Sequence, residues 1–176
     1  MNANVGSSQA IKDTFRALLR TTPYDTITVG DISAAAFVSK KTFYKYFENK
    51  EAVVHALYRD DFIQPVLDIR SCLEVDKSPT VVPLMLERNY ETLYSNRDIY
   101  LNLIEHYGWE KFVELRIESS QSMNRDIYAR HGVTGRELEY AAYFVAAAGA
   151  MVDLRWIRDG FKESPQEMAA LYARWI

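Results

Sequence analysis

The chain has 176 residues, of which 48% are hydrophobic, only seven are glycine and five are proline, and its formal net charge at pH 7 is −3. A chain of this length can bury a substantial core, and the scarcity of glycine and proline favours long helices over a sandwich of many short strands. The single cysteine, Cys72, excludes an internal disulfide framework and a metal site made of several cysteines.

The N-terminal quarter contains signals for short, capped helices. Apolar residues at helical spacing predict a first helix that Ser7 or Ser8 caps. Thr28 and Asp31 are three residues apart and predict a capping pair at the start of a short helix that ends near Ala36.

Two further caps follow at short intervals. Ser39 opens a helix predicted over 40–46, and Asn49 opens a helix predicted over about 50–70 with a disturbance at Pro65. Three short capped helices in so few residues predict a small module with its own core.

The rest of the chain also has helical periodicity. Helices are predicted at about 80–94, 98–106, 109–130, 134–158 and 165–175. Capping boxes at Thr134 and Ser164 open the last two. No strand pattern, repeat or flexible linker interrupts these segments, so the predicted fold class is all-α.

The segment 26–50 combines a small apolar core with a cationic outer face. Its apolar side chains are spaced to pack together: Ile32, Ala36, Val38, Phe43 and Phe47. The opposite face of the helix over 40–46 then carries Lys40, Lys41, Thr42, Tyr44, Lys45 and Tyr46. Lysine and hydroxyl side chains contact phosphates and base edges in a major groove. The pattern therefore predicts a helix-turn-helix that reads DNA, although a local charge excess of this size is usually only a solvated face.

The same segment resembles the DNA-binding signature of the TetR/AcrR family of bacterial regulators. The resemblance covers 11–54 and is carried by Ile32, Ala36, Val38, Ser39, Thr42, Phe43, Tyr44, Tyr46, Phe47, Lys50 and Glu51. It implies an all-α homodimer whose first three helices bind operator DNA, usually as a repressor. It also implies DNA contacts, position by position, at Thr28, Ser39, Lys40, Lys41, Thr42, Tyr44, Tyr46 and Lys50.

This chain departs from the family signature at the turn between the two short helices. Phe37 stands where the family frequently has glycine, and Ser33 stands where it usually has alanine. A bulky residue held at positive φ costs about 1–2 kcal/mol, so either the turn is strained or its geometry differs, and Phe37 could add apolar cover. Lys41, where small residues are common, adds a charge that could alter base preference.

The C-terminal part has a looser resemblance to one class of the family's C-terminal domains. The similar stretches are 147–149, 156–160 and 164–168. One branch of that class regulates dihydroxyacetone kinase genes and responds to a protein partner. We therefore predict a helix-turn-helix domain over 8–50 and a helical regulatory and dimerisation domain over 51–176.

Two alternatives remain for the signal to which a regulator of this kind would respond. The first is a small molecule that releases a repressor, and the second is a protein partner that docks on the C-terminal domain. An enclosed pocket with polar groups would favour the first alternative, and a filled core with an exposed apolar patch would favour the second. If a cavity exists, its expected lining is Leu86, Asn89, Tyr90, Leu93, Leu103, His106, Tyr107, Phe112, Arg116 and Ser120, although ordinary core packing also explains the aromatic residues.

The stretch from Tyr140 to Val152 is apolar on nearly every side and must be covered on nearly every side. A dimer through the last two helices would cover it; the alternative is a central helix of a monomer. The predicted interface is Leu138, Ala142, Val145, Gly149, Val152, Trp156, Met168, Leu171, Tyr172 and Trp175.

No pattern indicates an enzyme. The sequence contains no HExxH, GxSxG, P-loop or GxGxxG motif, and its histidines lack metal-ligand spacing. We predict no catalytic residues, cofactor or metal. Segment 1–13 lacks the pattern of a signal peptide, and Tyr140 to Val152 is too short to span a bilayer. We therefore expect a cytoplasmic protein that binds double-stranded operator DNA and a second copy of itself, with no membrane association.

Overall fold

The computed structural model describes residues 3–65, 68 and 81–174, and this part of the chain is helical throughout, without a strand. The helices are α1 (Ala3–Leu19), α2 (Val29–Ala35), α3 (Lys40–Tyr46), α4 (Lys50–Tyr58), α6 (Val81–Ser95), α7 (Arg97–Leu103), α8 (Trp109–Arg130), α9 (Gly135–Arg158) and α10 (Pro165–Tyr172). A 3-10 turn, η1 (Tyr24–Thr26), and two wider π-helical turns, η2 (Arg59–Ile63) and η4 (Ile104–Gly108), complete the order. The predicted all-α class is confirmed. None of the described helices is long and apolar enough to cross a membrane.

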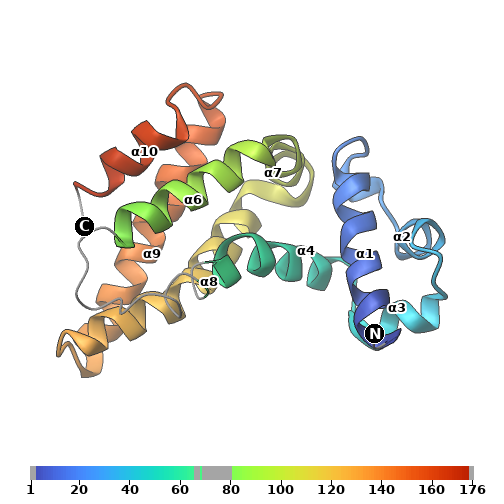
Figure 1. The fold of residues 1–176 in the computed structure, drawn as a ribbon, viewed down its shortest axis with the longest axis horizontal. Helices are drawn as coiled ribbons and strands as arrows, with labels where there is room; N and C mark the ends of the chain where they lie inside the picture. Colours follow the sequence, from blue (N-terminus) through green and yellow to red (C-terminus); the bar gives the residue numbers. More distant parts are fainter. Residues whose placement is uncertain (1–2, 66–67, 69–80, 175–176) are drawn as a thin grey trace.

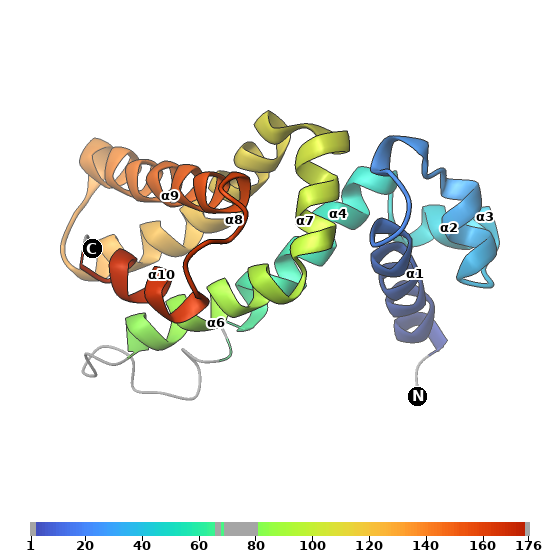
Figure 2. The ribbon, with the colours of Figure 1, turned by 90° about the horizontal axis from the view of Figure 1, so that it is seen from above.

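The described helices form two groups (Figures 1 and 2). Helices α1 to α3 lie together at one end of the molecule, and we call them the head. Helices α6 to α10 form the larger group, which we call the bundle, with α8 and α9 paired along their lengths and α10 packed on α6. Helix α4 runs from the head into the bundle, and the predicted domain boundary at residue 50 coincides with its first residue.

Local capping chemistry fixes the starts of the short helices. The Thr28 hydroxyl accepts from the Asp31 N–H, and the Asp31 carboxylate accepts from the Thr28 N–H at 2.8 Å. Ser39 and Asn49 accept from backbone N–H groups at the starts of α3 and α4, and Ser164 forms the predicted capping box of α10. Each cap satisfies a backbone donor that the helix itself leaves unpaired.

One helix start, one cap and the position of one disturbance differ from the prediction. Helix α1 begins at Ala3, before Ser7 and Ser8, and Thr134 makes no side-chain capping bond at the start of α9. The disturbance in the helix that begins at Lys50 comes at η2, before Pro65, where the Gln64 N–H reaches the Arg59 carbonyl five residues back. The predicted end of this helix near residue 70 lies outside the described residues.

The core of the head is the one that the sequence predicts. Ile32, Phe43 and Phe47 are buried together with Ile11 and Phe15 of α1. Ala36 is also buried and Val38 is partly buried against the same cluster, so the outer face of α3 is directed to solvent.

Phe37 lies in a strained turn between α2 and α3. Its φ is 54°, in the left-handed region that favours glycine, and its side chain is 97% exposed. The strain is therefore present, and the alternative that Phe37 adds apolar cover is wrong, because the ring contacts no core. Ser33, the neighbouring departure, is buried with no hydrogen-bond partner for its hydroxyl among the described residues.

We expect Phe37→Gly to raise the free energy of unfolding by about 1 kcal/mol, because glycine adopts positive φ without the Cβ clash. Urea denaturation of the purified protein measures the change. Phe37→Ala is the matched control: it removes the same exposed ring but keeps the clash, so its stability should stay within about 0.5 kcal/mol of wild type. Equal stabilisation by both substitutions would show that the backbone strain is not the cause.

Candidate DNA-binding surface and ligand cavity

The outer face of α3 carries most of the predicted DNA contacts. Lys40, Lys41 and Tyr44 are exposed, and α3 lies at the end of the head that is far from the bundle (Figure 2). Ser39 and Thr42 begin this helix with a hydroxyl–hydroxyl hydrogen bond of 2.9 Å. This surface combines cations, hydroxyls and a phenol, which are the groups that contact phosphates and base edges.

The remaining predicted DNA contacts differ in how far their side chains are exposed. Thr28 is exposed at the start of α2, where its hydroxyl donates to Asp31, and Tyr46 is half-buried against the core. Lys50 is directed inward. This placement corrects the prediction that its ammonium is free to meet a phosphate.

The Lys50 ammonium is bound by backbone carbonyls of the loop before α2. It donates to the carbonyl of Tyr24 at 2.7 Å and to that of Ile27 at 2.8 Å, and it lies 4.2 Å from the centre of the Tyr24 ring. Burial lowers the pKa of Lys50, and the nearby Asp25 opposes this effect. Lys50 therefore fixes the loop η1 to the first turn of α4.

The loop η1 also contacts the bundle. The ring of Tyr24 packs edge-on against Tyr107 with 5.0 Å between centres, and the Tyr107 hydroxyl donates to Glu51. Burial and then Glu51 raise the pKa of Tyr24 to about 12. Asn102 of α7 donates to the carbonyls of Leu19 and Thr22 at 2.7 Å, so η4 and α7 hold the end of α1 and the following loop.

A second contact between head and bundle is formed at Asp61 in η2. Arg16 of α1 donates to both oxygens of this carboxylate at 2.7 and 2.8 Å, and the Tyr100 hydroxyl of α7 donates to it at 2.7 Å. The hydrogen bond with Asp61 raises the pKa of Arg16, and burial, followed by the charge of Asp61, raises the pKa of Tyr100. The Asp61 carboxylate therefore joins η2 to α1 and α7, and its pair with Arg16 is bidentate and charge-assisted.

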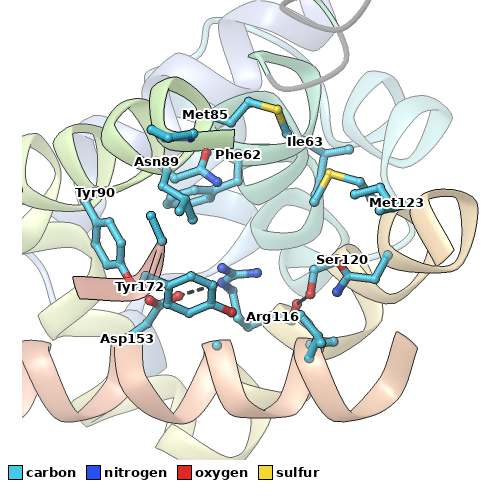
Figure 3. Close-up of a pocket in the computed structure, with 18 of the residues that line it drawn as sticks. Phe62, Ile63, Met85, Asn89, Tyr90, Arg116, Ser120, Met123, Asp153 and Tyr172 are labelled. Carbon is cyan, nitrogen blue, oxygen red and sulfur yellow. Dashed lines mark hydrogen bonds and ion pairs between the residues drawn. The ribbon is translucent and has the colours of Figure 1, made fainter. Parts of the chain in front are cut away.

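The bundle contains a partly open cavity of about 480 Å³ (Figure 3). Six of the predicted lining residues lie on its wall: Leu86, Asn89, Tyr90, Leu93, Arg116 and Ser120. The sequence did not identify the other side chains of the wall, which include Phe62, Ile63, Met85, Met123, Asn124, Ile127, His131, Asp153 and Tyr172. These come from η2, α6, α8, α9 and α10, and only a known tertiary arrangement brings them together.

Four predicted lining residues lie elsewhere, and the prediction is wrong for them. Leu103 and Phe112 are core residues, with Phe112 packed against the ring of Tyr100. Tyr107 holds Glu51 in the joint between head and bundle, and His106 is half-buried with its ring 3.7 Å from Asp25. Leu103, His106 and Tyr107 belong to α7 and η4, which lie against the head, and Phe112 lies in the first turn of α8.

The polar centre of the cavity is an ion pair between α8 and α9. Arg116 Nε donates to Asp153 Oδ2 at 2.8 Å, and the Asp153 side chain is only 3% exposed. Burial raises the pKa of Asp153, while Arg116 and then the Tyr90 hydroxyl oppose this effect. Such a pair needs good geometry to offset the desolvation of its charges. The described residues contain no cluster of three potential metal ligands.

The predicted dimer stripe packs inside the chain. Ala142, Gly149, Trp156 and Met168 are buried within one chain, and a Cβ added to Gly149 would lie 2.7 Å from the Tyr172 hydroxyl. The other predicted interface residues that the structure describes are half-buried: Leu138, Val145, Val152, Leu171 and Tyr172. Trp175 lies outside the described residues.

The uncovered face of α9 is the opposite one. Its exposed side chains are Tyr140, Tyr143, Phe144 and Met151, each at least half exposed. Figure 2 shows α9 along the edge of the molecule, with α8 on its inner side. The sequence placed the interface on the face of α9 that packs inside the chain, because the stretch from Tyr140 to Val152 is apolar on nearly every side.

A three-helix head with a cationic reading helix, joined to a helical bundle with a cavity, defines a DNA-binding transcriptional regulator. Two family models match the chain: "Bacterial regulatory proteins, tetR family" over residues 11–57 and "Transcriptional regulator C-terminal region" over residues 83–176. The second match covers more than half of the chain. The protein therefore belongs to the TetR family of bacterial transcriptional regulators.

Individual relatives have the same fold. The chain is 29% identical over 68 residues to the HTH-type dhaKLM operon transcriptional activator DhaS of Lactococcus lactis subsp. lactis (strain IL1403), and this match spans 39% of the chain but only 36% of that protein. The solved structure of a dihydroxyacetone kinase operon activator DhaS aligns with a TM-score of 0.66 at 19% identity, over 96% of this chain and 93% of that one.

Two further structures align over similar lengths. The fatty acid degradation regulator FadR from Bacillus halodurans has a TM-score of 0.56 at 17% identity, over 96% of this chain and 93% of that one. The TetR family repressor AlkX from Dietzia sp. strain DQ12-45-1b has a TM-score of 0.50 at 18% identity, over 96% and 94%. At these identities the structures establish the fold alone.

Substitution of Lys50 should lower the stability of the protein, whereas substitution of Lys41 should weaken its binding to DNA. We expect Lys50→Met to lower the free energy of unfolding by about 2 kcal/mol, because buried carbonyls lose a charged donor. Lys41→Met should leave stability nearly unchanged but weaken operator binding and flatten the slope of log K against log salt by about 0.9. Urea denaturation and operator titrations at several salt concentrations measure both effects. A full salt-slope change for Lys50→Met without loss of stability would show that Lys50 meets the phosphate directly.

Proposed function

We propose that this regulator is a homodimeric repressor that leaves its operator when a small molecule occupies the bundle cavity. The observation that carries this proposal is the cavity itself. Its volume of about 480 Å³ falls in the range of ligand sites, and an apolar wall surrounds a few convergent polar groups. A filled core would have favoured the protein-partner alternative.

A connected path from the cavity to the head supports this mechanism. Phe62 and Ile63 of η2 line the cavity, and η2 continues α4 without a break. The other end of α4 begins at Lys50, which is fixed to the head by backbone carbonyls. A ligand that displaces η2 would therefore tilt α4 and move the reading helix.

The geometry of operator DNA makes such a tilt effective. In a dimer, the two reading helices must lie about 34 Å apart to enter successive major grooves on one face of the double helix. The effector must bind the non-operator arrangement more tightly, and this difference in affinity sets how far it shifts the equilibrium.

The uncovered face of α9 is the proposed dimer interface. An apolar face on a helix that is already paired on its inner side requires a partner, and a two-fold arrangement would bury the same face on both copies. Tyr140 and Phe144 would lie near the centre of this interface, at 62% and 72% exposure in the single chain.

The second candidate is a regulator whose bundle docks a protein partner. The exposed apolar side chains on α9 favour this alternative. In that case the same face of α9 would bind a different protein, and the cavity would have no regulatory role.

Phe144→Glu should give a monomer at micromolar concentration, because two charges would be buried against each other at the centre of the interface. Tight operator binding should be lost with the dimer, since each monomer retains one half-site. Leu101→Glu is the control, because Leu101 is 43% exposed on α7, away from this face. Sedimentation equilibrium measures the mass, and a Phe144→Glu protein that dimerises like wild type would rule out this interface.

Ser120→Phe should fill the cavity and separate the two candidate effectors. Ser120 is buried on the cavity wall, so a ring at this position would occupy the space of a ligand. An operator is first selected from a random DNA pool and labelled. A lysate of the source cells is then divided by ultrafiltration into a small-molecule filtrate and the retained proteins. The assay measures whether each fraction releases the labelled operator from the protein. We expect the filtrate to release wild-type protein and to leave Ser120→Phe bound. Release by the retained proteins alone, or equal release of both forms, would contradict the proposal.

A further inference from the structure

The guanidinium of Arg116 has two terminal nitrogens that form no hydrogen bond with the part of the chain that the structure describes. Its Nε is bonded to Asp153. Figure 3 shows the group in the middle of the cavity, between Tyr172 and Ser120. The terminal nitrogens of one arginine form a planar fork with parallel N–H bonds, which matches the two oxygens of a carboxylate.

The surroundings of this fork are suited to a small polar group with an apolar tail. The Asn89 side-chain amide lies at the cavity wall with its oxygen buried and unpaired among the described residues, and a half-turn of this amide would present its N–H donors to a bound carboxylate. The hydroxyls of Tyr90 and Tyr172 lie on the same wall. The rest of the wall is mostly apolar, with Phe62, Ile63, Met85, Leu86, Met123 and Ile127.

We propose that the effector is an amphipathic monocarboxylate, whose carboxylate binds the terminal nitrogens of Arg116 and whose apolar part fills the space between η2, α6 and α8. This inference rests on the proposed function and names the chemical class of its effector. A phosphate ester fits less well, because it has up to two negative charges, whereas Arg116 is the one arginine among the described lining residues and is already paired with Asp153.

Asp153 sets the strength of this interaction. A bound carboxylate and Asp153 would share one guanidinium, with like charges close together in a poorly solvated space. Asp153 therefore compensates the charge of Arg116 when the cavity is empty, and it lowers the affinity of Arg116 for a bound carboxylate. Replacing Asp153 by its neutral amide should tighten acid binding.

The test compares acids with their own amides in isothermal titration calorimetry of the full-length protein. The probes are octanoate, decanoate, benzoate and phenylacetate, each paired with its primary amide. Wild-type protein should bind its best acid about tenfold or more tightly than the matched amide, which corresponds to one charge-assisted hydrogen-bond pair. Asp153→Asn should bind the same acid several-fold more tightly than wild type.

The control variant removes both charges together. Arg116→Met alone would leave Asp153 buried without a partner, so the variant of choice is Arg116→Met with Asp153→Leu, an apolar pair of similar volume. Its thermal unfolding shows that it is folded. It should bind the acid and the amide within about twofold of each other, because the guanidinium alone distinguishes them.

Each outcome decides one claim. If wild type binds amides as tightly as acids, if no acid binds, or if the double variant retains the preference for acids, the inference is wrong. Operator release is measured with the same compounds. An acid that binds through Arg116 without releasing the operator would contradict the proposed function and leave the assignment of the ligand class intact.

Discussion

The carboxylate of Asp61 is the contact on which the coupling of the two parts of this protein depends. It lies in η2, between the helix that enters from the head and the wall of the cavity, and it accepts from Arg16 and Tyr100 at 2.7–2.8 Å. A bidentate, partly buried pair of this kind has directional strength that an exposed ion pair lacks. Because α1, η2 and α7 all meet at this group, the proposed mechanism would transmit a displacement of η2 to the head through it.

The two wide helical turns in the described part of the chain lie where the head meets the bundle. η2 contains Asp61, and η4 contains Tyr107, whose ring and hydroxyl contact η1 and α4. A π-helical turn inserts a residue into the helical ladder and is frequent at functional positions. In the proposed mechanism η2 is the element that shifts, and small shifts of packed elements between discrete arrangements are a known form of switching.

Features that depend on neighbours in the sequence could be predicted, and features that depend on distant neighbours could not. The caps at Thr28, Ser39, Asn49 and Ser164 are local hydrogen bonds, and the structure forms each of them. The core of the head follows from the spacing of apolar residues on two short helices. Lys50 could not be placed, because the carbonyls that bind it are more than twenty residues away in the chain.

The bundle shows the same limit on a larger scale. Spacing on α6 and α8 correctly indicated Asn89, Tyr90, Arg116 and Ser120 as neighbours, but α7 and η4 have an equally good pattern and face the head. Asp153 is an acid in an otherwise apolar stretch of α9, and this was the signal that could have found the ion pair. The face of α9 that lies outward could not be chosen, because its stretch from Tyr140 to Val152 is apolar on nearly every side and only the position of α8 decides.

Gly149 has a consequence for how this regulator can diverge. Its lack of a side chain leaves room for the Tyr172 hydroxyl, which forms part of the cavity wall. A single-base change to alanine would force the phenol away from α9 and alter the shape of the space, while the ion pair and the reading helix stayed intact. Duplicated copies of the gene could in this way acquire different chemical signals while they still recognised the same promoter.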